Sequence, residues 1–128
     1  MKRTFFSLAL LLAVATLTAQ TKMTAREAAV KIADRILAST TYEFKNTKTG
    51  EIYKSVKKLP LDMDVKVACK YNNWHYTNGV TNMALMELGD KLGDKKYEKY
   101  VLKNMNFVFN EGNLDFFRKQ YDEAFKRD

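Results

Sequence analysis

Residues 72–97, NNWHYTNGVTNMALMELGDKLGDKKY, are the stretch that indicates the fold of this chain. An aromatic beginning leads through Gly79 into an apolar helix, which Gly93 ends. Asp94 is a good cap for the next helix, so two helices joined by a short corner are expected to pack side by side. An aromatic cluster at the mouth of such a pair suits a helical barrel that binds sugars.

A helix is also predicted near the start of the chain, over about residues 25–38. Thr24 and Glu27 form a capping-box pattern, in which each side chain bonds the backbone of the other residue. The apolar residues that follow recur at helical spacing. They are Ala29, Ile32, Ala33, Ile36 and Leu37.

Two more helices are predicted after Asp94. The first carries an apolar stripe and ends at the turn formed by residues 110–112. The stripe consists of Tyr97, Val101, Met105 and Val108. Asn113 is predicted to cap the last helix, whose apolar edge consists of Leu114, Phe117, Tyr121 and Phe125. The pattern as a whole predicts an all-α protein.

The segment between residues 41 and 71 is less regular. Residues 46–50 are rich in turn formers, and residues 51–56 alternate either as a short strand or as extended loop. Pro60 excludes a helix around it. Residues 62–71 fit one or two helical turns as well as an irregular approach to the aromatic cluster, and both alternatives stay open.

Residues 1–19 are predicted to be a secretory signal peptide. Lys2 and Arg3 form a basic start, residues 5–17 form an apolar run, and Ala19 is the expected last residue before cleavage. The run is shorter than the roughly 20 residues of a membrane span, so an uncleaved anchor is the less favoured alternative. With Cys69 as the only cysteine, this start suggests export to the periplasm of a Gram-negative bacterium.

The chain is basic, with 22 Lys and Arg against 15 Asp and Glu and a formal net charge of +7. Many of the lysines lie within residues 45–70. An exported protein is not expected to meet nucleic acid, so an acidic glycan is the partner that this charge would suit. The alternative, which is the more common case, is a basic face that contacts only solvent.

The sequence predicts no catalytic residue, metal ligand or cofactor site. Acid–base chemistry on sugars needs a carboxyl group in a cleft with a shifted pKa, and the Asp residues here have simpler roles as caps or solvated charges. Those considered are Asp62, Asp64, Asp90, Asp94 and Asp122. His75 is the only histidine and has no neighbouring ligands in the sequence. Cys69 is expected to be a buried structural thiol.

Trp74, Tyr76 and Asn78 are the candidate substrate-binding residues. They lie immediately before the predicted apolar helix. Aromatic rings stack on the C–H faces of sugar rings, and an Asn amide can bond hydroxyl groups. The alternative is that the two aromatic side chains belong to the hydrophobic core.

Residues 74–97 resemble the first helical hairpin of the unsaturated glucuronyl and rhamnogalacturonyl hydrolases, which are glycoside hydrolase families 88 and 105. In these families an aromatic residue and a nearby Gly begin an apolar helix that ends in a Gly-Asp-x-x-Tyr corner. The matching residues here are Tyr76, Thr77, Asn78, Gly79 and Val80, then Leu92, Gly93, Asp94, Lys95, Lys96 and Tyr97. The likeness covers about residues 25–109.

The resemblance implies an (α/α)6 barrel made of six such hairpins. Enzymes of these families act on oligosaccharides left by polysaccharide lyases, which carry an unsaturated uronic acid at the non-reducing end. An Asp protonates the double bond and activates water, without a metal or organic cofactor. The resemblance assigns sugar binding to Tyr76, with Trp74 and Asn78 as neighbours. It assigns no catalytic residue, because Asp122 lacks the sequence context of the family's first catalytic Asp.

A barrel of this kind needs a longer chain, so residues 20–128 are expected to be the N-terminal part of a secreted glycoside hydrolase, with the catalytic Asp residues beyond Asp128. The alternative is a small periplasmic helical module that binds a partner, has no catalytic activity and is complete in itself. The barrel fragment and the complete module are expected to differ in stability. Hairpins taken from a barrel expose apolar stripes and aggregate, whereas a complete module melts cooperatively as a monomer.

Overall fold

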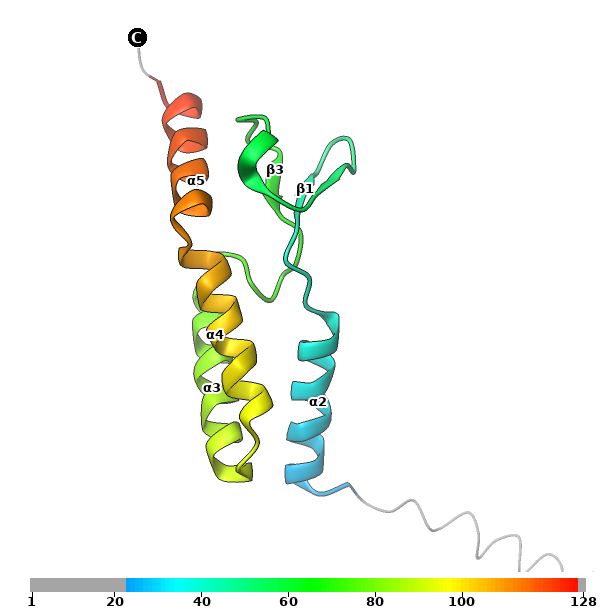
Figure 1. Ribbon diagram of the computed structural model, residues 1–128. Coiled ribbons are helices and arrows are strands. Elements are labelled where there is room, and N and C mark those ends of the chain that lie inside the picture. The colour runs from blue at the N-terminus through cyan, green and yellow to red at the C-terminus, as the bar shows by residue number, and fades with distance from the viewer. Residues whose placement is uncertain (1–22, 127–128) are drawn as a thin grey trace, which may run out of the picture.

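The computed structural model describes residues 23–126, which form an elongated molecule with two halves (Figure 1). One half contains the helices α2 (Ala25–Ser39), α3 (Tyr76–Leu92) and α4 (Lys95–Phe109). The other contains a small sheet and helix α5 (Glu111–Ala124). The predicted signal peptide, with its cleavage point at Ala19, lies outside the described residues. Within them, no helix is both long enough and apolar enough to cross a membrane.

The described chain is mostly helical, as predicted, but it is not all-α. Strands β1 (Phe44–Asn46), β2 (Ile52–Tyr53) and β3 (Val65–Val67) form an antiparallel sheet in the order β2-β1-β3. The short-strand alternative for residues 51–56 is therefore confirmed at β2. Residues 62–71 contain β3 and no helix. Strands β1 and β3 have three residues each, which is too short to show an alternating pattern in the sequence.

The predicted helix caps are confirmed at Thr24 and Asp94. The Oγ1 atom of Thr24 accepts a hydrogen bond from the backbone N–H of Glu27 at 3.2 Å, and the Glu27 carboxylate accepts one from the backbone N–H of Thr24 at 2.8 Å. The Asp94 carboxylate accepts from the backbone N–H of Lys96 at 3.0 Å. Gly93, with φ +66°, ends α3 in the left-handed conformation that glycine adopts most readily.

Two predicted helix starts are wrong. Helix α3 begins at Tyr76 instead of near Val80, because the ring of His75 caps it by accepting a bond from the backbone N–H of Thr77 at 3.4 Å. Helix α5 is capped by Asn110, whose side chain accepts from the backbone N–H of Asn113 at 3.0 Å. Asn113 is instead buried in the first turn of α5.

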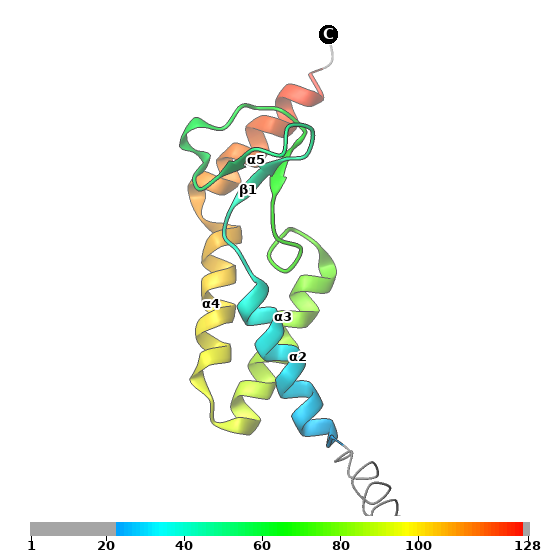
Figure 2. The same ribbon diagram turned by 90° about the vertical axis from the view of Figure 1, so that its right-hand side faces the viewer.

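Each half of the molecule has its own hydrophobic core. The first lies between α2, α3 and α4, which run side by side in Figure 2. Its buried residues are Ala33, Leu85, Tyr97, Tyr100 and Val101. The second core lies between the sheet and α5, with Phe44, Val65 and Phe116 buried and Phe107 at the end of α4 packed against them.

Helix α3 has apolar residues on two opposite faces. Leu85 faces the first core, whereas Tyr76, Val80 and Met83 are exposed and recur at the spacing of one helix face. A helix that is apolar on all sides is usually covered on all sides. Other exposed large apolar side chains lie on α2, α4 and α5 or directly after α5, and they are Ile32, Leu102, Phe109, Tyr121 and Phe125.

The close approach of α3 and α4 depends on Gly89. A Cβ atom at Gly89 would lie 3.1 Å from the backbone oxygen of Asp94 and 3.2 Å from the Cβ atom of Tyr97. We expect Gly89→Ala to lower the free energy of unfolding by about 1–3 kcal/mol through overpacking.

Gly79→Ala in the same helix is the matched control, since a Cβ there meets no atom within 4 Å. Because Ala is the better helix former, this change should be neutral or stabilise by up to about 1 kcal/mol. Urea unfolding followed by circular dichroism measures both, and equal effects would contradict the close packing at Gly89.

Candidate functional site

Two cavities meet at the segment that joins β3 to α3. Figure 1 shows this segment between the two halves of the molecule. The strand cavity, of about 440 Å³, is lined by β3, by α5 and by this segment. The helix cavity, of about 330 Å³, is lined by the same segment, the beginning of α3 and the end of α4. Asn73, Trp74 and His75 line both cavities.

Trp74 and Tyr76 lie outside both hydrophobic cores. Trp74 is 59% exposed, and its ring contacts that of Phe109 at a centroid distance of 5.7 Å. Tyr76 is 83% exposed, and both residues line the helix cavity. Their ring faces are therefore available to a ligand. A stacking ring needs such access, and a core ring does not have it.

Asn78 also lines the helix cavity, but its amide group is already engaged. The side chain is buried, and its Nδ2 atom donates to the backbone oxygen of Lys70 at 2.8 Å and to both oxygens of Asn73. These bonds hold the segment before α3 against the helix. Asn78 thus positions Trp74, and it does not offer this N–H group to a sugar.

Sequence reasoning missed four further asparagines that line the helix cavity: Asn72, Asn73, Asn82 and Asn104. The Nδ2 atom of Asn104 donates to Asn82 at 3.1 Å. Its oxygen accepts from the Tyr42 hydroxyl at 3.1 Å. Burial raises the pKa of Tyr42 to about 12, so its hydroxyl remains a donor. Asn78 and Asn82 lie four residues apart on one face of α3, which was the available sequence signal.

Asn72 adds a buried acceptor to this wall. It is only 2% exposed, and its Nδ2 atom donates to the backbone oxygen of Thr41 at 2.7 Å. Its Oδ1 atom has no hydrogen-bond partner in the part of the chain that the structure describes. Buried polar atoms are almost always paired. This oxygen is enclosed by the protein, so it is not open to a ligand in the structure as it stands.

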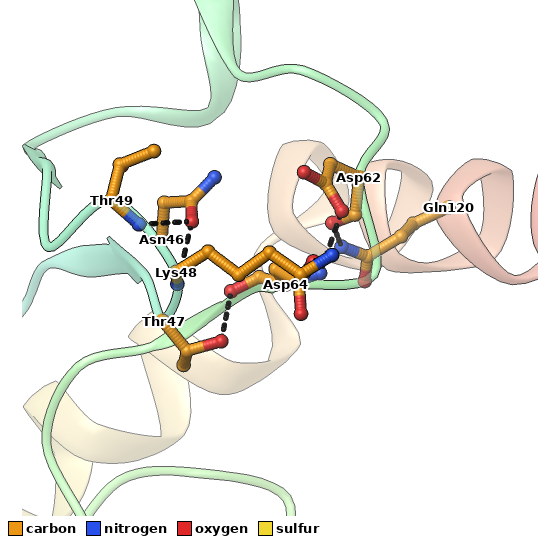
Figure 3. A network of polar contacts seen from close by, with 7 residues as sticks. All are labelled: Asn46, Thr47, Lys48, Thr49, Asp62, Asp64 and Gln120. Carbon is orange, nitrogen blue, oxygen red and sulfur yellow. Dashed lines mark hydrogen bonds and ion pairs between the residues drawn. The ribbon is translucent and has the colours of Figure 1, made fainter.

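The strand cavity has a polar network at one side, shown in Figure 3. Gln120 of α5 donates from Nε2 to the backbone oxygens of Asp62 and Val65, the second at 2.9 Å. The Lys48 ammonium pairs with the Asp64 carboxylate at 2.5 Å. Gln120 thereby ties α5 to the sheet. Lys66, the residue after Val65 on β3, is among the residues that line the cavity.

The carboxyl groups with a shifted pKa within residues 23–126 are all shifted toward the ionised form. Hydrogen bonds from Lys96 and from the Tyr97 hydroxyl lower the pKa of Asp34, and the hydrogen bond from Lys48 lowers that of Asp64. The pKa values of Glu27 and Glu87 are lowered by hydrogen bonds from Thr24 and Lys91. A general acid in glycoside hydrolysis needs a raised pKa. None of these four carboxyl groups is suited to that role.

Cys69 is buried and free, as expected, and its Sγ atom accepts from the backbone N–H of Tyr71 at 3.4 Å. The ring of His75 bonds the Thr77 hydroxyl at 2.8 Å. The described part of the chain contains no group of three or more His, Cys, Asp or Glu residues that could hold a metal ion.

Asp122 is exposed on α5 and lines neither cavity. Its position agrees with the expectation that this carboxyl group is a solvated charge.

Comparison with known proteins gives no relative for this chain. No protein-family model matches it, and neither a curated protein nor a solved structure does so. Its function is therefore argued from the residues of the two cavities.

Proposed function

We propose that this chain is the N-terminal part of an exported glycoside hydrolase that acts on unsaturated uronyl oligosaccharides, and that it contributes to binding the sugar. The observation that carries the proposal is the position of Trp74 and Tyr76. Both rings are exposed, and both border a cavity whose other wall is rich in amide groups. Stacking rings facing hydrogen-bonding amides are what a sugar requires, since its ring has apolar C–H faces and a polar rim of hydroxyls.

The two apolar faces of α3 support the proposed barrel. In an (α/α)6 barrel each hairpin packs against its neighbours on both sides, so a helix of the inner ring is covered all round. The exposed stripe of Tyr76, Val80 and Met83 would then be covered by neighbouring hairpins, except at Tyr76, which lies at the end of the helix next to the cavity.

The shifted carboxyl groups support a binding role for residues 23–126. Asp34 and Asp64 are held ionised by neighbouring Lys residues and lie outside both cavities. In the proposed enzyme, the Asp that acts as acid and base therefore belongs to another part of the protein. In the described part, the rings hold the uronyl sugar and the amides orient its hydroxyls.

Calorimetric titration of the intact protein with an unsaturated uronyl disaccharide tests this function. Tyr76→Ala and Trp74→Ala should each weaken binding about tenfold, which corresponds to roughly 1–2 kcal/mol for loss of an aromatic contact. The melting temperature should hardly change, because both rings are exposed. Phe109→Ala would change the contact with Trp74, so Phe125→Ala is the control: this exposed ring follows the end of α5, lines neither cavity and contacts only the ring of Tyr121 among the aromatic pairs of the described residues.

Two outcomes would count against the proposal. If both substitutions lower the melting temperature and leave the affinity unchanged, the rings are structural. If the protein binds the disaccharide but the near-ultraviolet absorbance of the disaccharide does not decay, the chain belongs to a periplasmic module that binds sugars and has no catalytic activity.

A further inference from the structure

We propose that the outer edge of β3, together with the strand cavity beside it, binds an extended peptide segment of a partner protein. In this segment apolar and acidic side chains alternate, and it adds a fourth strand to the sheet. The proposed sugar site is the helix cavity, so this inference goes beyond the proposed function and does not depend on it.

Strand β3 forms one edge of the sheet and, in the described part of the chain, pairs with β1 alone. The backbone N–H of Ala68 donates to the backbone oxygen of Glu43, just before β1, at 2.8 Å. Bonds between two antiparallel strands occur at every second residue. The N–H and C=O groups of Val67, one residue earlier, therefore point away from β1 toward the outer edge.

Gln120 already occupies one position along this outer edge. Its Nε2 atom donates to the backbone oxygen of Val65 at 2.9 Å, as an N–H group of a neighbouring strand would. The backbone N–H and C=O groups of Val67 form no hydrogen bond with another group of residues 23–126. Unpaired backbone groups at a sheet edge are a template on which another extended chain can pair.

The strand cavity offers the apolar side chains of such a peptide a place to pack. Val67 lies on the side of β3 that faces α5, and Phe117 of α5 lines the cavity with it. Met63 and Trp74 also line the cavity and are 46% and 59% exposed. An extended chain places every second side chain on this side of the sheet. Apolar side chains there would cover these exposed surfaces and leave water.

The other side of the sheet is basic at this edge. Because side chains alternate along a strand, Lys66 lies on the side away from α5. It is exposed there, directly opposite Lys45 of β1. The neighbouring Asp64 carboxylate is bound by Lys48. Acidic side chains on an added strand would offset the repulsion between Lys66 and Lys45. A second copy of this chain suits the edge less well, because it would bring another Lys66 beside the first.

Binding is measured by the fluorescence of Trp74, which lines the strand cavity and is the only tryptophan of the chain. With the intact protein at low salt, a synthetic peptide of about seven alternating Val and Glu residues should bind about tenfold more tightly than the corresponding Val and Lys peptide. Lys66→Glu should reverse this preference. Lys99→Glu is the matched control, since Lys99 is exposed on α4 and lines neither cavity.

Two N-methylated forms of the Val and Glu peptide test whether it binds as a strand. In an extended peptide the N–H groups of the Val residues point to one edge, and those of the Glu residues point to the other. Methylation of the edge that pairs with β3 should weaken binding about tenfold, because Val67 loses its partner. Methylation of the other edge should change the affinity by less than about twofold.

Four results would overturn this inference. The first is that no peptide changes the fluorescence of Trp74, and the second is that the Val and Glu peptide has no advantage over the Val and Lys peptide. The third is that both methylated peptides bind as tightly as the parent, since the peptide is then not an added strand. The fourth is a dimer without peptide that Lys66→Glu strengthens, which would assign the edge to a second copy. Binding of the disaccharide is measured separately, so the proposed function can stand when this inference fails.

Discussion

Phe44→Ala is expected to lower the free energy of unfolding by about 3–5 kcal/mol, the largest change predicted for a single substitution here. Phe44 is only 1% exposed, and its ring packs against the rings of three other phenylalanines. The centroid distances are 5.4 Å to Phe107, 6.3 Å to Phe116 and 6.0 Å to Phe117. Removing the ring leaves a cavity at the point where the sheet, α4 and α5 meet, and that cavity cannot close without moving all three.

Urea unfolding of the intact protein measures this effect. Phe44→Leu should cost less, because Leu fills most of the space. Phe125→Ala, at an exposed ring, should change the free energy by less than about 0.5 kcal/mol. If Phe44→Ala costs no more than Phe125→Ala, the second core does not hold the sheet in place as described.

Gln120→Leu is expected to lower the free energy of unfolding by about 2–4 kcal/mol. Gln120 is buried, and its Nε2 atom donates to the backbone oxygens of Asp62 and Val65. Leu has a similar volume and no donor, so both carbonyl groups lose their partner. Each such loss costs about 1–3 kcal/mol when the group is buried. Figure 3 shows the bond to Asp62, which connects α5 to the segment leading into β3.

Arg118→Leu is the matched control for this substitution, because Arg118 is exposed on the same helix. It should change the free energy of unfolding by less than about 0.5 kcal/mol. Hydrogen exchange gives a second readout, since loss of the Gln120 bonds should speed exchange of backbone N–H groups in β3 more than in α2. Uniform acceleration in both would mean that Gln120 does not hold β3 specifically.

The helical elements could be predicted because their signals are local. The capping box at Thr24 and Glu27 and the corner at Gly93 and Asp94 each depend on residues within one turn of each other. The apolar spacing in α4 needs no knowledge of its partner. The start of α5 was mistaken because both Asn110 and Asn113 are good caps. Asn110 is the cap in the structure, because the side chain of Asn113 is engaged elsewhere and donates to the backbone oxygen of Phe107 at 2.7 Å.

For the candidate site, the sequence by itself determined the aromatic segment at Trp74 and Tyr76 and its place at the beginning of α3. Only the tertiary structure decided that both rings are exposed, and that Lys66 and Gln120 stand on one side of Trp74 with Asn104 on the other. The physical reason is that β3 pairs with β1 and packs beneath α5, so the cavity walls come from residues far apart in the chain. The cavity walls come together because Phe44, Val65 and Phe116 are buried against one another. No local sequence pattern predicts this contact between the sheet and α5.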